Sequence, residues 1–132
     1  MIEFKNLVKK FGDRTVLKGL SFSIQEGEIL FILGTSGTGK SVLLKNLVGL
    51  LRPDGGEIWL DGQELSKLSE IEYLPIRKKC GMVFQQPALF DSLTIFENVA
   101  FGLRRHERLP ELALKERVLK ALSLVNLVGV EQ

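Results

Sequence analysis

A glycine-rich run at residues 34–41 carries the residue types that bind phosphate. It reads Gly34, Thr35, Ser36, Gly37, Thr38, Gly39, Lys40 and Ser41. Glycine lets the backbone wrap closely round an anion, because a side chain would block positive φ angles and close approach. Backbone N–H groups then converge on the phosphates, Lys40 reaches the β- and γ-phosphates, and the Ser41 hydroxyl ligates Mg²⁺. The pattern therefore predicts a nucleoside triphosphate site.

The segments on either side of this loop are those that the chemistry needs. Glu28–Leu33 precedes the loop, and its unbroken apolar part is typical of a strand buried on both faces. After the loop, residues 41–51 predict a helix that stops near Leu51, because Pro53 cannot continue it. Its apolar face comprises Leu43, Leu44, Leu47, Val48 and Leu51. A helix N-terminus behind the loop adds partial positive charge to the phosphate site.

The composition limits the classes of protein to which the chain can belong, but it does not identify one. At 132 residues, with 45% hydrophobic and 26% charged residues, it predicts at most one folded domain. The net charge of +2 does not indicate a nucleic-acid partner. A single cysteine, Cys80, excludes an internal disulfide and favours a reducing compartment. Without an apolar signal core or a membrane-length stretch, we expect a soluble, cytoplasmic chain that reaches a membrane only through a partner.

The N-terminal third has the pattern of β structure. Polar and apolar residues alternate at residues 2–5 and 20–25, as in half-buried antiparallel strands. Gly12-Asp13 and Glu26-Gly27 are turn signals. Farther along, Glu57–Leu60 predicts a short strand, and Asp61-Gly62 predicts a hairpin turn after it.

The remaining residues predict helices and one more strand. Ser69 and Glu72 form a capping-box pattern for a short helix that Pro75 is expected to interrupt, leaving Ile76–Lys79 at the surface. Cys80–Phe84 is a second apolar run and a candidate central strand.

Two helices are expected near the C-terminal end. Thr94 and Glu97 repeat the capping-box pattern and open a helix through about Leu103, followed by a charged link at Arg104–Arg108. Pro110 suits the first turn of another helix. Its expected buried face is Leu114, Val118, Leu122 and Val125, with Glu116 and Lys120 paired on the exposed side.

Three motifs in order resemble the N-terminal part of an ABC-transporter ATPase subunit. They are Val8–Gly12 with Val16–Ile24, Gly56–Gly62, and Met82–Gln85, placed around a Walker A phosphate loop. The resemblance implies an α/β P-loop NTPase of ABC type, truncated, with an N-terminal antiparallel β subdomain and the start of the helical subdomain. Residues 1–132 then form a partial nucleotide-binding domain. A GTPase is disfavoured because Asn-Lys-x-Asp, which reads guanine, does not occur.

The resemblance assigns roles to individual residues. It implies nucleotide binding by Phe11, Gly34, Thr35, Ser36, Gly37, Thr38, Gly39, Lys40, Ser41 and Gln85, with ATP and Mg²⁺ as cofactors. Phe11 matches the aromatic residue that stacks on adenine, where the family more often has tyrosine. Ser41 and Gln85 are the expected Mg²⁺ contacts. Gln85–Phe96 is the expected docking segment for an integral membrane permease subunit, and a second ATPase subunit is the expected dimer partner.

The second half of the family's catalytic machinery has no match in these residues. We find no Leu-Ser-Gly-Gly-Gln-like signature and no apolar strand ending in Asp-Glu. Asp61 belongs to a hairpin turn, Asp91 is followed by serine, and His106 lies in a charged link, so it is interpreted as a surface histidine rather than the switch histidine. Because hydrolysis needs charge stabilisation on both sides of the γ-phosphate, we expect this chain alone to bind nucleotide weakly, with negligible turnover. The missing strands also predict exposed apolar surface.

The run Phe84–Phe101 resembles one group of ABC-transporter ATPase subunits in particular. It is similar to the ATPase subunit of Mla-type (maintenance of lipid asymmetry) phospholipid transporters, which implies an ATP-binding subunit on the cytoplasmic face of a bacterial inner membrane. Two alternatives stay open: a fragment or regulatory module that binds nucleotide or the membrane subunit without hydrolysis, and a soluble ABC protein of translation or DNA repair. A nucleotide kinase fits poorly, because the region before the loop is rich in β structure.

Overall fold

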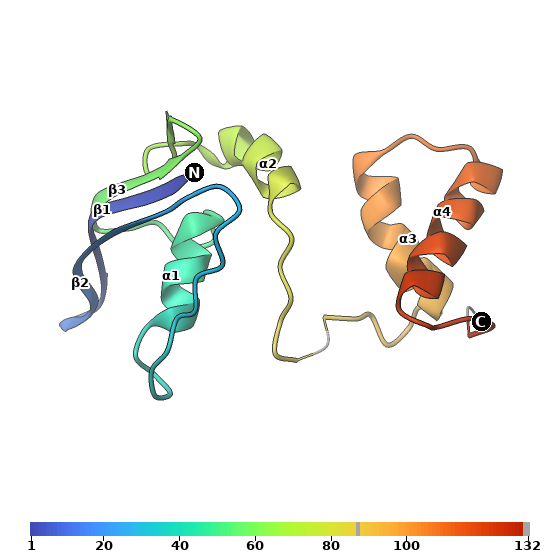
Figure 1. Ribbon diagram of the computed structural model, residues 1–132, viewed down its shortest axis with the longest axis horizontal. Coiled ribbons are helices and arrows are strands. Elements are labelled where there is room, and N and C mark those ends of the chain that lie inside the picture. Colours follow the sequence, from blue (N-terminus) through green and yellow to red (C-terminus); the bar gives the residue numbers. More distant parts are fainter. Residues whose placement is uncertain (87, 131–132) are drawn as a thin grey trace. The chain divides into compact units, whose positions relative to one another are not determined.

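The chain folds into two compact units, Met1–Met82 and Val83–Gln132. The computed structural model describes residues 1–86 and 88–130 and is drawn in Figure 1. The phosphate loop belongs to the first unit and Gln85 to the second. None of the helices in these described ranges is long and apolar enough to cross a membrane.

The first unit is built on a four-stranded antiparallel sheet in the order β2-β1-β3-β4. The strands are β1 (Ile2–Phe11), β2 (Arg14–Ile24), β3 (Gly55–Leu60) and β4 (Gln63–Glu64). The turns predicted at Gly12-Asp13 and Asp61-Gly62 connect β1 to β2 and β3 to β4. The period-two pattern thus predicted parts of β1 and β2 correctly, whereas β4 was not predicted.

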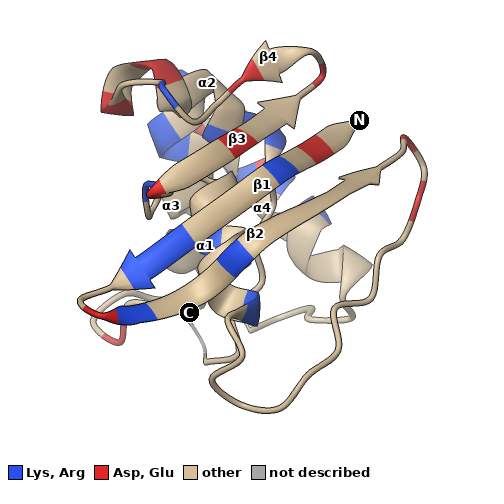
Figure 2. Cartoon of the chain, turned by 90° about the vertical axis from the view of Figure 1, so that its left-hand side faces the viewer, with Lys and Arg blue, Asp and Glu red and all other residues tan. Residues whose placement is uncertain are grey.

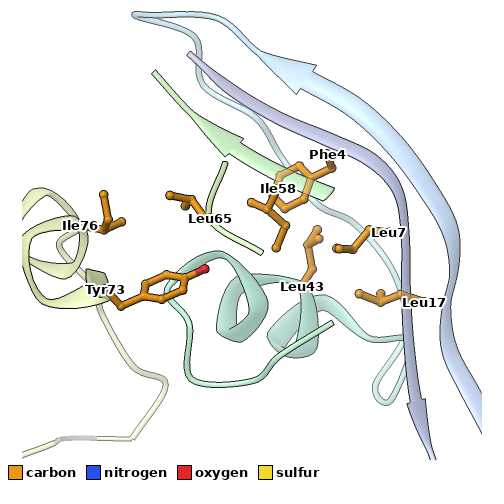
Figure 3. Packing of buried hydrophobic residues seen from close by; sticks show 8 residues of the cluster. All are labelled: Phe4, Leu7, Leu17, Leu43, Ile58, Leu65, Tyr73 and Ile76. Atoms are coloured by element: carbon orange, nitrogen blue, oxygen red, sulfur yellow. The ribbon is translucent and has the colours of Figure 1, made fainter. Parts of the chain in front are cut away.

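One face of the sheet is covered by α1 (Lys40–Leu47), the helix that follows the phosphate loop. Leu43 of α1 is buried in one core with Leu7 of β1 and Ile58 of β3, as Figure 3 shows. Leu7 and Ile58 are fully buried. Burying a leucine-sized side chain contributes about 1.5–3 kcal/mol, so these contacts fix the short helix on the sheet.

The helix ends earlier than predicted, at Leu47 rather than near Leu51. Gly49 has a φ of +69° and follows the last turn. Its N–H donates to the Asn46 carbonyl, while the Leu50 N–H donates to the Lys45 carbonyl. This pair of hydrogen bonds is a Schellman motif, which terminates a helix at a glycine in the left-handed region.

A second helix, α2 (Glu70–Lys79), packs beside the same core. The predicted capping box is present, because the Ser69 and Glu72 side chains each accept from the other residue's backbone N–H. The predicted interruption at Pro75 is wrong, since the helix continues through it. Proline removes one helical hydrogen bond, but burial of Tyr73 and Ile76 holds the turn in place. Ile76 is therefore core rather than surface.

Two apolar runs predicted as strands are not strands. Ile29, Phe31 and Leu33 of the run before the loop are 79%, 79% and 89% exposed, and Glu28–Leu33 has no regular structure. The run Cys80–Phe84 is likewise irregular, and Val83 is fully exposed. A strand needs neighbouring strands to satisfy its backbone groups. Among the described residues, no strand pairs with either run.

The second unit is a helical hairpin of α3 (Ile95–His106) and α4 (Glu111–Leu124). Thr94 caps α3 in the predicted capping box, but α3 runs to His106 rather than Leu103. The core comprises Ala100, Leu114, Val118 and Leu122, whereas Val125 is 63% exposed because α4 ends at Leu124. In place of a Glu116–Lys120 pair, Arg117 forms an ion pair with Glu107, with 3.0 Å between nitrogen and oxygen.

Loss of the Thr94 cap is expected to destabilise the second unit. Thr94→Ala leaves the Glu97 N–H without its side-chain acceptor and is expected to cost about 1 kcal/mol. Thr94→Ser keeps the hydroxyl and serves as the control. Amide hydrogen exchange in the first turn of α3 should become faster in Thr94→Ala only, and equal exchange in both variants would contradict the assignment.

Candidate functional site

The phosphate loop lies between β2 and α1, and its backbone reaches solvent. Residues 34–38 are exposed, and Gly39 is the buried N-cap of α1 with a φ of +102°. A Cβ atom on Gly39 would lie 2.8 Å from Val16 Cγ1 and 3.2 Å from Leu17 Cδ2. The motif glycine is therefore required both by its backbone angle and by close packing of the loop against β2.

Side chains of the motif close the loop on itself. The Lys40 ammonium donates to the Gly34 carbonyl at 2.6 Å and to the Thr35 carbonyl at 2.7 Å. The Thr38 hydroxyl also donates to the Thr35 carbonyl, at 2.9 Å. Lys40 thus lies across the loop, which places its positive charge where the motif predicts phosphate.

The backbone N–H groups of Ser36, Gly37 and Thr38 are available to an anion. In the ranges that the structure describes, none of them donates a hydrogen bond to a protein group. The N-terminus of α1 lies directly behind them and contributes partial positive charge. Ser41 is exposed in the first turn of α1, so its hydroxyl is accessible as an oxygen ligand. These donors and this hydroxyl fit a triphosphate with Mg²⁺.

A cleft of about 750 Å³ extends from the loop to the β1–β2 turn. Its walls are Asp13, Arg14, Thr15, Val16 and Lys18 with Ser36, Gly37 and Thr38. Arg14 Nη2 lies 3.5 Å from the Gly37 carbonyl oxygen. Lysine and arginine lie on both sides of the hairpin end in Figure 2. The sequence analysis missed Arg14 and Lys18, although their position just after the turn signal was a usable clue.

Phe11 lies at the end of β1 and is 47% exposed. The Lys9 ammonium is 5.5 Å from the centre of its ring. Phe11 does not line the cleft beside the loop. Its stacking on adenine therefore stays a prediction.

Gln85 and the expected docking segment belong to the second unit. Gln85 and Gln86 are exposed, and Pro87 lies outside the described residues. Leu89 is 65% exposed and Phe90 is 49% exposed. The structure therefore brings Gly34–Ser41 together as one site and leaves Gln85 outside that unit.

Asn98 of α3 holds the backbone of residues 90–94 within the expected docking segment. Its side-chain carbonyl accepts from the Phe90 N–H at 2.8 Å, and its amide donates to the carbonyls of Phe90, Leu93 and Thr94. The Phe90 ring packs 4.9 Å from that of Phe101, between ring centres. Asn98 has no period or spacing that marks it in the sequence, so its role becomes visible only in the fold.

Asp61 and His106, which were not expected to be catalytic, have ordinary surroundings. Asp61 accepts a hydrogen bond from the Met1 ammonium at 2.8 Å, and this contact holds the Asp61 pKa below its usual range. His106 is the exposed last residue of α3, as expected for a surface histidine.

Comparison with known proteins identifies the family. The ABC transporter family model matches residues 17–132. The chain belongs to the ABC transporter family. Its α/β fold is the ABC-type P-loop fold, with the antiparallel β subdomain and the first helices of the helical part.

Two curated relatives show what this ABC transporter chain is similar to. It is 45% identical over 129 residues to the "Intermembrane phospholipid transport system ATP-binding protein MlaF" of Haemophilus influenzae, covering 98% of this chain and 49% of the relative. It is 43% identical to the "Probable ribonucleotide transport ATP-binding protein mkl" of Mycobacterium leprae, covering 99% of this chain and 38% of the relative.

A solved structure shows the same fold. It is the ATP-binding cassette MJ0796 in a dimeric, post-hydrolysis state bound to ADP and Pi, with a TM-score of 0.87 and 33% identity. The match covers 100% of this chain and 61% of that structure. The ABC transporter chain thus spans about half of the length of the first curated relative.

The close packing of Gly39 gives a test of the loop geometry. Gly39→Ala places a Cβ atom against Val16, whereas Gly62→Ala introduces the same kind of positive-φ strain, at +82°, with nothing within 4 Å. The control should lose about 1 kcal/mol of stability, and Gly39→Ala should lose about 1–3 kcal/mol more. Urea unfolding followed by Trp59 fluorescence measures both, and equal losses would contradict the packing argument.

Proposed function

We propose that this chain provides the ATP-binding site of an ABC transporter subunit. One observation carries the proposal: Lys40 closes a loop whose Ser36, Gly37 and Thr38 N–H groups have no partner among the described residues. Such an arrangement binds an anion by converging donors and a fixed cation. The ABC family match supports ATP as that anion.

Each part of the loop has a role in this proposal. The N–H groups of Ser36–Thr38 and the Lys40 ammonium hold the β- and γ-phosphates. The Ser41 hydroxyl would hold Mg²⁺, which neutralises phosphate charge when it is bound. The role of Gln85, in the second unit, as a further Mg²⁺ contact stays a prediction from the family resemblance. Arg14 and Lys18 contribute positive charge from the opposite wall of the cleft. Phe11 stacks on the base from the end of β1.

The residues of this chain bind and orient the nucleotide but do not activate water. No signature sequence and no Asp-Glu strand end occurs in the 132 residues, so the chain brings no general base to the γ-phosphate. We propose that ATP hydrolysis belongs to a protein as long as the relatives, acting as a dimer of ATPase subunits. The chain by itself binds without appreciable turnover.

We propose that the segment Gln85–Phe96 docks on a membrane permease subunit. Leu89 and Phe90 are exposed, Asn98 holds the backbone of Phe90, and the two side chains offer an apolar surface to that partner. Through that partner, the chain lies on the cytoplasmic face of the inner membrane. We propose phospholipid as the transported substrate, on the strength of the Mla-like run and the printed name of the MlaF relative. The name of the mkl relative, ribonucleotide transport, marks the alternative substrate class.

Mg-ATP binding is the first test of the proposal. Lys40→Ala removes the cation across the loop and is expected to weaken Mg-ATP binding about tenfold or more, because it deletes charge-assisted hydrogen bonds. Lys45→Ala is the matched control, since Lys45 is an exposed lysine on the same helix. Isothermal titration calorimetry measures both affinities.

Two results would contradict nucleotide binding at the loop. One is equal affinity in Lys40→Ala and Lys45→Ala, and the other is no binding by a parent chain that circular dichroism shows to be folded. Steady-state phosphate release by the parent chain above the rate of the Lys40→Ala variant would contradict the absence of turnover.

Membrane docking is tested with vesicles. The chain should sediment with inside-out inner-membrane vesicles of the source cell and not with liposomes made from the extracted lipids. Leu89→Asp should lower the bound fraction about tenfold by placing a charge in the apolar contact. Leu112→Asp, at a residue of α4 that is 73% exposed, should bind like the parent. Equal binding to protein-free liposomes would contradict docking on a permease subunit.

A further inference from the structure

The end of α1 away from the phosphate loop is held by a residue of α2. Arg77 Nε donates to the Val48 carbonyl at 2.9 Å, and its Nη2 donates to the Gly49 carbonyl at 3.0 Å. These carbonyls follow the last turn of α1, where the Schellman motif at Gly49 has already used the Lys45 and Asn46 carbonyls. Arg77 therefore satisfies two carbonyls just beyond the helix end, which the Schellman motif does not use.

The side chain of Arg77 is itself fixed on several sides. Glu70, two turns earlier on the same face of α2, forms an ion pair with it. The Arg77 guanidinium carbon lies 5.6 Å from the centre of the Tyr73 ring. The Arg77 hydrogen bond favours the charged carboxylate and holds the Glu70 pKa below its usual range. The guanidinium is thus preorganised where it meets α1.

Tyr73 adds a steric element to the same contact. A Cβ atom on Gly49 would lie 2.6 Å from two carbons of the Tyr73 ring. Tyr73 is 5% exposed and belongs to the core that includes Leu43 of α1. The end of α1 is therefore seated against α2 by a packed ring and tied to it by the Arg77 hydrogen bonds.

We propose that Arg77 is a positioning residue for the phosphate site, acting through α1. This proposal rests on the proposed function of the loop. Arg77 itself neither lines the cleft nor belongs to the phosphate-binding motif. The helix has only 8 residues, and a helix shorter than about 12–15 residues is marginal without outside contacts. A cation at its C-terminal end stabilises the helix dipole.

The short length of α1 couples Arg77 at one end of the helix to the phosphate site at the other. Eight residues span about 12 Å, so a shift or fraying at Leu47 reaches Lys40 within two turns. Lys40 and the N–H groups before it need a formed first turn to face the phosphates. Loss of the Arg77 contacts is expected to loosen the anion site without touching it.

The experiment compares three variants for binding of Mg-ATP and of inorganic tripolyphosphate. Arg77→Met keeps the length and removes every donor. Arg77→Lys keeps the charge, but the lysine ammonium cannot donate to both carbonyls with the fixed geometry of a guanidinium. Lys78→Met is the matched control, because Lys78 is an exposed residue of the same helix with no hydrogen bond or ion pair among the described residues. Trp59 emission and circular dichroism confirm that each variant is folded.

Arg77→Met is expected to weaken both ligands by the same factor, about fivefold to tenfold. Arg77→Lys should recover about half of that loss, and Lys78→Met should stay within about twofold of the parent. A loss for Mg-ATP without a loss for tripolyphosphate, or equal effects of Arg77→Met and Lys78→Met, would overturn the proposal. If Arg77→Met does not fold, Arg77→Lys decides, and an unchanged tripolyphosphate affinity overturns it.

Hydrogen exchange without ligand tests the effect of Arg77 on α1 independently of nucleotide binding. Without any ligand, Arg77→Met should speed exchange of the residue 40–50 amides about fivefold over the parent, because the helix end frays. If the parent binds neither ligand, the proposed function fails, and the exchange comparison still decides the role of Arg77. Unchanged exchange in these amides overturns it.

Discussion

The orientation of one short helix is the constraint on which the site depends. Leu43 fixes the middle of α1 against the sheet, close packing of Gly39 on Val16 fixes its beginning, and Tyr73 with Arg77 fixes its end. None of these contacts involves a group that faces phosphate. Backbone N–H groups cannot change rotamer as side chains can, so the accuracy of that part of the anion site comes from the packing of the helix behind it.

Features encoded by neighbouring residues were the predictable ones. The phosphate loop, both capping boxes and the two hairpin turns each depend on a few adjacent side chains, and all were found where the sequence placed them. Glu28–Leu33 failed as a strand because a strand is defined by partners elsewhere in the chain. Pro75 failed as a helix breaker because Tyr73 and Ile76 anchor α2 through burial, which local propensity does not contain.

In the candidate site, too, the residues marked by a local motif were predictable and those that act through the fold were not. Lys40 was predictable from its motif, and its contacts with Gly34 and Thr35 agree with the expected place of the charge. Arg14 and Asn98 were not predictable, because one joins the cleft through the β1–β2 turn and the other acts through four hydrogen bonds to a loop. Phe11 and Gln85 were named through family resemblance, and their contacts with nucleotide stay predictions.

The irregular run before the loop has a thermodynamic consequence. The loop is anchored firmly on one side by α1, but on the other side it continues into Glu28–Leu33, which has no regular structure. Ordering a backbone residue costs about 1–2 kcal/mol of conformational entropy. A ligand that orders this segment would therefore bind with a favourable enthalpy and an opposing entropy. A neighbouring strand beside Ile29–Leu33 would lower that entropic cost in advance and tighten binding without touching the nucleotide.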